Sequence, residues 1–295
     1  MKKRVITGAV LLAIFLPLII IDHIKYPIVG TLFLILGVFL SMVASYEMMN
    51  MFYLRYPSLK TLRYIIPVFS GLLVLGIHYS NHFEYSLEII FLLIFVLFSL
   101  LLTIFTKKST AYDIMSCIST LAYAGLMFGY VIQIRYLEPF SSPDQIVYLR
   151  GGRSFGYLYS IVLATDTFAY LIGTRFGKRK LCPDISSKKS VEGAIAGLIA
   201  GSIAGVLAVF IFKLSHPSEL GEYIVVITLS FFLSMFLSFM VQIGDLVASK
   251  IKRTFEIKDF GNIFPGHGGV LDRFDSLIYS GVAYYIIVQV LVLVS

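Results

Sequence analysis

Residues 221–249, GEYIVVITLSFFLSMFLSFMVQIGDLVAS, form the stretch that decides the fold of this chain. Their side chains are mostly apolar over more than the roughly 20 residues that an α-helix needs to cross the hydrocarbon core of a bilayer. Charged residues enter only near the two ends of the stretch. It is therefore expected to form one helix that spans a membrane and projects past it.

Similar apolar runs recur along all 295 residues, and only 14% of the residues are charged. Soluble domains carry about 25% charged residues, so the composition predicts an all-α, polytopic integral membrane protein without a sizeable soluble domain. Nine spanning helices are expected, near residues 5–22, 28–50, 62–79, 85–105, 112–134, 155–175, 192–212, 221–249 and 275–294.

The distribution of Lys and Arg between the loops predicts how these helices are oriented. With the N-terminus in the cytoplasm, nineteen of the 24 basic residues fall in cytoplasmic segments and five fall outside. The charged loops 176–191 and 250–274 then lie on one side, as a shared active site requires. We therefore expect an active site that faces the cytoplasm, in the inner or plasma membrane of the cell.

The chain is expected to have two functional parts. Residues 1–150 carry few polar groups within the expected spans and are interpreted as a transmembrane scaffold. Residues 151–295 carry the charged loops and are interpreted as the catalytic region. Outside the spans, no basic stretch is interleaved with aromatic residues, so membrane lipids are expected as partners and nucleic acid is not.

Residues 242–275 concentrate acids, bases and glycines in this apolar chain. Carboxylates supply the oxygen ligands that Mg²⁺ shares with substrate phosphates, basic side chains bind phosphate, and glycines let the backbone approach a ligand closely. The pattern predicts metal-assisted phosphoryl or nucleotidyl transfer at a membrane surface. The segment includes Asp245, Lys252, Arg253, Lys258, Asp259, Gly266, His267, Gly268, Gly269, Asp272, Arg273 and Asp275.

Four polar residues of this segment share one face of the expected eighth helix. Gln242, Asp245, Ser249 and Lys252 follow the spacing i, i+3, i+7, i+10, and such residues lie above one another on a helix. Asp272 and Asp275 point the same way if the ninth helix begins near Leu271. Asp245, Asp272 and Asp275 are therefore expected to converge on a cation. The alternative is a network of salt bridges with Lys252, Arg253 and Arg273.

A second group of polar residues precedes the expected seventh helix. Ser186, Lys188, Lys189 and Ser190 lie just before its start, and Ser190 has the side chain of an N-cap residue. Lysines beside a helix N-terminus predict a phosphate site. Asp166 lies within the sixth span, where a carboxylate usually faces a cavity or a partner; the alternative is a structural hydrogen bond between helices.

Glycines 193, 197, 201 and 205 recur every four residues along the expected seventh helix. Small residues at this spacing let two helices approach closely within a membrane. The stripe is therefore interpreted as structural.

Together these residues resemble the signature of the phosphatidate cytidylyltransferases, also called CDP-diglyceride synthases. The signature is matched at Ser249, Lys252, Arg253, Lys258, Asp259, Gly261, Pro265 to Gly269, Asp272, Arg273 and Asp275. A D-x-x-A-Y element of that family is matched at Asp166, Ala169 and Tyr170. An S-P-x-K-[ST]-x-E-G element is matched from Ser186 to Gly193, except that Ser187 replaces the usual proline.

The resemblance implies that CTP and phosphatidic acid react to give CDP-diacylglycerol and pyrophosphate. It also implies a homodimer, Mg²⁺ and a second cation such as K⁺. The metal ligands would be Asp245, Asp272 and Asp275. The catalytic residues would be Asp166, Lys189, Asp245, Lys252, Arg253, Asp272, Arg273 and Asp275. Substrate would be bound by Ser186, Lys188, Ser190, Ser249, Lys258, Asp259, Gly266, His267, Gly268 and Gly269.

Two other classes of function stay open from the sequence. A CTP-dependent lipid kinase, or a cytidylyltransferase for another lipid phosphate, would keep the chemistry and change the acceptor. A lipid transporter or flippase would use Asp166 and Asp245 as coupling sites and would move its substrate without cleaving a nucleotide.

Overall fold

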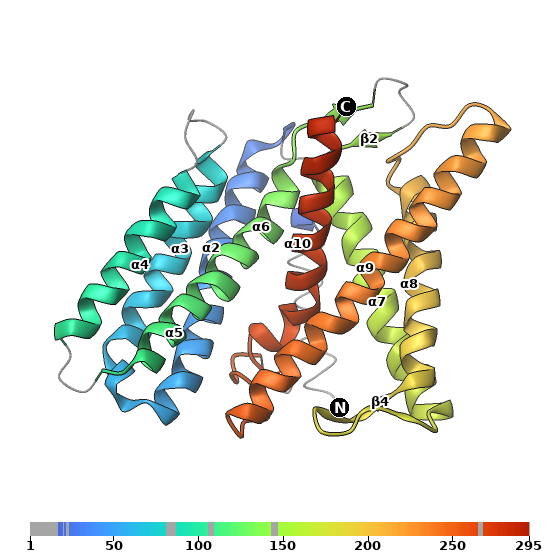
Figure 1. Ribbon diagram of the computed structural model, residues 1–295. Coiled ribbons are helices and arrows are strands. Elements are labelled where there is room, and N and C mark those ends of the chain that lie inside the picture. The colour runs from blue at the N-terminus through green and yellow to red at the C-terminus, as the bar shows by residue number, and fades with distance from the viewer. Residues whose placement is uncertain are drawn as a thin grey trace. The chain divides into compact units, whose positions relative to one another are not determined.

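The computed structural model describes residues 17–19, 21, 24–80, 87–105, 109–142, 147–264 and 268–294. It is built almost entirely of helices (Figure 1). The long helices are α2 (Pro27–Arg55), α3 (Leu62–Ser80), α4 (Leu87–Phe105), α5 (Ala111–Thr120), α6 (Phe128–Gln133), α7 (Gly151–Phe176), α8 (Val191–Ile211), α9 (Leu220–Thr254) and α10 (Leu271–Val294).

The expected membrane spans correspond to these helices. Among the described residues, seven segments are long and apolar enough to cross a membrane, and the apolar α4 is an eighth match to an expected run. The expected first span, near 5–22, falls mostly outside the described residues. α9 has 35 residues, more than a bilayer requires, and α10 begins at Leu271. The length of α9 was expected, and the start of α10 meets the condition under which Asp272 and Asp275 can point the same way. The all-α membrane fold is confirmed.

The expected span 112–134 is helical throughout but not uniform. It runs from Ala111 to Tyr136 as one apolar segment. Between α5 and α6 lies a π-helical stretch, η2 (Leu121–Met127), and the segment ends in the 3-10 turn η3 (Ile134–Tyr136). Hydropathy reports the length of a span but not such a local change in winding.

The chain divides into two compact units. The first comprises Met1–Leu18, His23–Gln133 and Lys252–Phe274, and the second comprises Ile19–Asp22, Ile134–Ile251 and Asp275–Ser295. The division at residue 150 proposed from the sequence concerns function and stays a prediction. The charged segment 252–274, which lies within the expected catalytic region 151–295, groups structurally with the helices of the N-terminal half.

The first unit is held together by close helix contacts and buried hydroxyl groups. Ser41 donates from α2 to the carbonyl of Ala124 at 2.6 Å, and Ser70 of α3 donates to Ser45 of α2 at 2.9 Å. Such bonds matter in a membrane, where no water satisfies a polar group within the hydrocarbon region.

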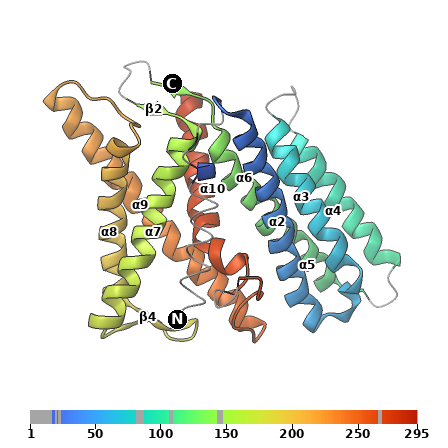
Figure 2. The same ribbon diagram turned by 180° about the vertical axis from the view of Figure 1, so that it is seen from behind.

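The second unit is centred on α7 and α8, which run side by side (Figure 2). The glycine stripe of α8 makes this contact possible. A side-chain Cβ at Gly193 would lie 2.6 Å from the carbonyl oxygen of Ala169, and one at Gly197 would lie 2.8 Å from that of Thr165. The structural role expected for the stripe is therefore confirmed.

Two short hairpins complete the second unit. One pairs β1 (Phe140–Ser141) with β2 (Tyr148–Leu149), and the other pairs β3 (Lys180–Cys182) with β4 (Ser186–Ser190), both antiparallel. The β3–β4 hairpin connects the end of α7 to the start of α8. It thereby brings the predicted phosphate-binding residues to the N-terminus of α8.

Candidate active site

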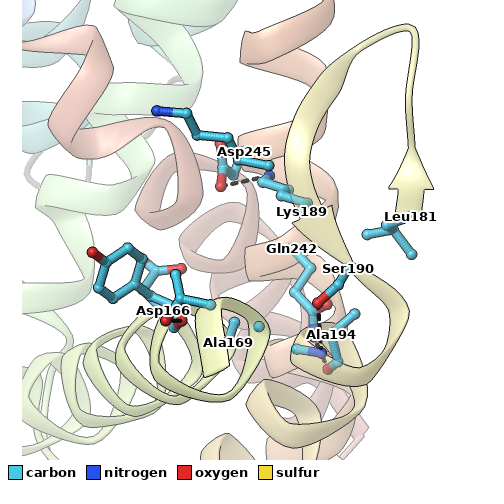
Figure 3. A pocket seen from close by; sticks show the side chains of 13 residues that line it. Asp166, Ala169, Leu181, Lys189, Ser190, Ala194, Gln242 and Asp245 are labelled. Atoms are coloured by element: carbon cyan, nitrogen blue, oxygen red, sulfur yellow. Dashed lines mark hydrogen bonds and ion pairs between the residues drawn. The ribbon is translucent and has the colours of Figure 1, made fainter. Parts of the chain in front are cut away.

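A pocket of about 260 Å³ lies wholly within the second unit. It is formed by α7, the β3–β4 hairpin, the first turn of α8 and the polar face of α9 (Figure 3). Several residues singled out from three separate stretches of sequence therefore line one cavity. Its polar side chains include Asp166, Tyr170, Thr174, Lys188, Lys189, Ser190, Gln242 and Asp245.

An ion pair crosses this pocket. The Lys189 ammonium lies 2.5 Å from the Asp245 carboxylate, and the two side chains are 26% and 35% exposed (Figure 3). Lys189 comes from the hairpin and Asp245 from α9. Because both groups remain partly accessible, a phosphate and a cation can each reach one of them.

The N-terminus of α8 opens into the same pocket. Ser190 caps the helix, its hydroxyl oxygen accepting a hydrogen bond from the Gly193 amide at 3.2 Å, as expected from the sequence. The Glu192 carboxylate accepts bonds from the amides of Lys178 and Arg179 at 3.0 and 3.2 Å. These bonds fix the hairpin against the helix start, where the helix dipole favours an anion.

The polar face of α9 is directed toward α8 and the hairpin. Gln242 donates from its side-chain amide to the Ala194 carbonyl at 3.1 Å, and Ser249 donates to Asp245 at 3.4 Å. Asp166, on α7, lines the pocket with them. The predicted cavity-facing position of this intramembrane acid therefore agrees with the structure, whereas its chemical role stays a prediction.

The other expected site residues lie in or near the segment 252–274. Lys252, at the carboxyl end of α9, donates to the Asp272 carboxylate at 2.7 Å. The other oxygen of Asp272 accepts bonds from the amides of Phe260 and Gly269 at 2.8 and 3.0 Å. Asp272 thus forms a salt bridge with Lys252, as the alternative to a metal site predicted. Asp275 accepts a bond from the Ser276 amide at 2.8 Å.

Four of the expected site residues in this segment are exposed: Arg253, Lys258, Asp259 and Arg273. Ser186 lies in β4 and is partly exposed. Gly268 has φ +85°, a backbone conformation that favours glycine, and its carbonyl accepts a bond from the Phe264 amide at 2.9 Å. Pro265, Gly266 and His267 lie outside the described residues.

Sequence reasoning missed one acid. Glu47 of α2 is 4% exposed, and its two carboxylate oxygens accept bonds from the amides of Val270 and Leu271, each at 3.0 Å. It therefore caps the start of α10, inside the first unit. The available signal was the single acid of a mostly apolar helix, which does not reveal its partner.

The carboxylates are compatible with a metal ion shared with a substrate. Among the described residues, no three His, Cys, Asp or Glu side chains gather as a ready-made metal cage. Mg²⁺, however, is commonly held by one or two carboxylates together with substrate phosphates, and Asp166 and Asp245 line one pocket. The set Asp245, Asp272 and Asp275 stays a prediction.

The fold and the pocket together define a class of protein. A helical membrane protein with lysines, carboxylates and a helix N-terminus around one cavity is suited to chemistry on phosphates near a lipid bilayer. Residues 2–291 match the model of the cytidylyltransferase family. The chain therefore belongs to this family.

Its relatives include bacterial enzymes named phosphatidate cytidylyltransferase. The one from Bacillus subtilis is 34% identical over 286 residues, covering 95% of this chain and 94% of the relative. The one from Staphylococcus haemolyticus is 31% identical over 289 residues, covering 95% of each chain. The similarity extends over the N-terminal helices as well as the signature segment.

Proposed function

We propose that this protein is a phosphatidate cytidylyltransferase, which transfers CMP from CTP to phosphatidic acid and releases pyrophosphate. Family membership and the names of its relatives support this reaction. The structural observation that carries the proposal is the pocket in which Lys189 and Asp245 meet beside the capped N-terminus of α8. All of its groups suit a phosphorylated substrate.

In the proposed reaction, a phosphate oxygen of phosphatidic acid attacks the α-phosphorus of CTP. A new P–O bond forms, and the bond to the β,γ-pyrophosphate breaks. The attacking phosphate is already ionised near pH 7, so no strong general base is needed. What the protein must supply is position and positive charge.

Lys188, Lys189 and the N-terminus of α8 would bind phosphate oxygens, while Asp245 and Asp166 would hold Mg²⁺ on the triphosphate. When bound, Mg²⁺ offsets negative charge and orients the leaving pyrophosphate. The exposed Arg253, Lys258 and Arg273 would supply further positive charge around the substrates. The proposal also includes a second cation such as K⁺, a cytoplasm-facing site in the plasma membrane, and a homodimer.

The test follows the label of CTP. Purified protein in mixed micelles with phosphatidic acid and Mg²⁺ receives CTP labelled at either the α- or the γ-phosphate. The proposal expects α-label in a lipid and γ-label in pyrophosphate. Asp245→Ala should lose turnover while remaining folded. Asp184→Ala is the matched control, since Asp184 is exposed in the hairpin turn and does not line the pocket.

Each alternative gives a different pattern of label. A lipid kinase would place γ-label in the lipid. A cytidylyltransferase for another acceptor would show α-label only with a different lipid phosphate. A transporter would leave CTP intact across all acceptors, and this outcome in folded protein would refute the proposed reaction.

A further inference from the structure

Glu47 lies in an otherwise apolar helix, at a position where a charged side chain is costly. α2 has 29 residues, and Glu47 is 4% exposed. A buried carboxylate must be compensated by several hydrogen bonds or by a cation. The bonds from the Val270 and Leu271 amides provide part of this compensation, and these amides belong to the turn that starts α10, where a negative charge is also favoured by the helix dipole.

Two glycines allow the backbone of the signature segment to approach Glu47 closely. A Cβ at Gly261 would lie within 2.6 Å of the carboxyl carbon of Glu47, and a Cβ at Gly269 would lie within 2.5 Å of it. Any other residue would push the chain away from the carboxylate. The close fit shows that Glu47 is packed against this segment rather than joined to it only by two hydrogen bonds.

A second carboxylate holds the same segment. Asp272 accepts bonds from the amides of Phe260 and Gly269 and from the Lys252 ammonium. The Lys252 ammonium also lies 5.3 Å from the centre of the Phe260 ring. Between them, Glu47 and Asp272 bind four backbone amides, those of residues 260, 269, 270 and 271.

We infer that Glu47 is a positioning residue for the reaction proposed above: it braces residues 260–261 and 269–272 of the signature segment and thereby holds Lys252 and Asp272 in place. This inference rests on the proposed function for its kinetic consequence, but not for the brace itself. Glu47 would touch neither substrate nor metal. It would act through the backbone of Val270 and Leu271, which directly precede the signature residues Asp272 and Arg273.

The test compares Glu47→Gln with Asp113→Asn. Gln has the same shape as Glu, but its NH₂ group would face a backbone N–H donor. Asp113 is a matched control, because it is also a fully buried acid of the first unit and caps α5 through the Thr110 amide. Both substitutions should lower stability, whereas only Glu47→Gln removes an acceptor of the signature segment.

Two measurements are made on the full-length protein in micelles. Hydrogen–deuterium exchange should become at least about tenfold faster at residues 269–271 in Glu47→Gln and stay unchanged there in Asp113→Asn. The kcat/KM for CTP, per folded molecule, should fall about tenfold or more in Glu47→Gln and stay within about twofold in the control, since loss of a hydrogen bond to a charged group typically has this size.

Unchanged exchange at residues 269–271 in Glu47→Gln would overturn the brace. Faster exchange with unchanged kcat/KM would overturn the positioning role. If wild-type protein forms no CDP-lipid, the proposed function fails, and exchange alone still decides for or against the brace. If Glu47→Gln does not fold, Glu47→Asp is used, because it keeps the charge but is one methylene too short to reach both amides.

Discussion

Replacing Lys252 with methionine is expected to lower the free energy of unfolding by about 3–5 kcal/mol, because it leaves a buried carboxylate without its cation. The Lys252 ammonium and the Asp272 carboxylate are 2.7 Å apart, and the two side chains are only 11% and 2% exposed. Methionine keeps most of the apolar stem of lysine, so packing should change little. The loss in the free energy of unfolding therefore measures the cost of leaving the Asp272 carboxylate unpaired.

The double variant Lys252→Met/Asp272→Asn separates this pair from other roles of Asp272. Asparagine can still accept a bond from the Phe260 or Gly269 amide through its carbonyl oxygen, and neither member of the pair then carries a charge. We expect the double variant to be at least about 2 kcal/mol more stable than the sum of the two single losses predicts, as for residues in direct contact.

The assay is a reversible denaturant titration of the four proteins in mixed micelles, followed by helix content. Lys258→Met serves as the matched control, because Lys258 lies in the same segment but is exposed, and its change should stay within about 0.5 kcal/mol. Losses that simply add, within about 0.5 kcal/mol, would refute the reasoning. Asp272 would then be retained for another reason, such as a metal ion.

Four further changes have direct readouts. Gly201→Leu forces a side chain against α7 and α9 and should lower the free energy of unfolding by about 1–3 kcal/mol or more, measured in micelles. Gly221→Leu is the control and should be neutral, because the surroundings of Gly221 are open. Ser190→Ala removes the cap of α8 and should cost about 1 kcal/mol in the same titration. Lys189→Ala should raise the KM for CTP about tenfold in a steady-state assay, with Lys180→Ala as an exposed control. Chelation of Mg²⁺ should abolish turnover, and added Mg²⁺ should restore it. Equal effects of a variant and its control, or turnover in chelator, would contradict the corresponding assignment.

Much of the fold follows from the sequence because a membrane imposes a simple rule. Within lipid every backbone group must bond internally, so each apolar run of sufficient length becomes a helix. Local signals were equally readable: the cap at Ser190 and the glycine stripe of α8 depend only on neighbouring residues and appear as expected.

The contacts between distant parts of the chain could not be predicted from such local patterns. Glu47 meets the amide of Leu271 across 224 residues, and nothing in an apolar helix indicates which backbone its one carboxylate will bind. The choice between a metal role and an ion pair for Asp272 was likewise open, because both use the same charges. The π-helical stretch Leu121–Met127 could not be predicted from hydropathy.

The charges of the pocket explain why a metal ion is expected to take part. Two lysines and two aspartates line it, namely Lys188, Lys189, Asp166 and Asp245, and their formal charges cancel. A triphosphate brings about four negative charges and a lipid phosphate about one to two more, whereas the N-terminus of α8 offsets only about half a charge. The pocket side chains alone therefore cannot neutralise both substrates. A divalent cation on Asp245 would use the carboxylate that now pairs with Lys189, and it would free that lysine for phosphate. In the proposed reaction, the two groups of this ion pair would separate when the nucleotide and its metal bind.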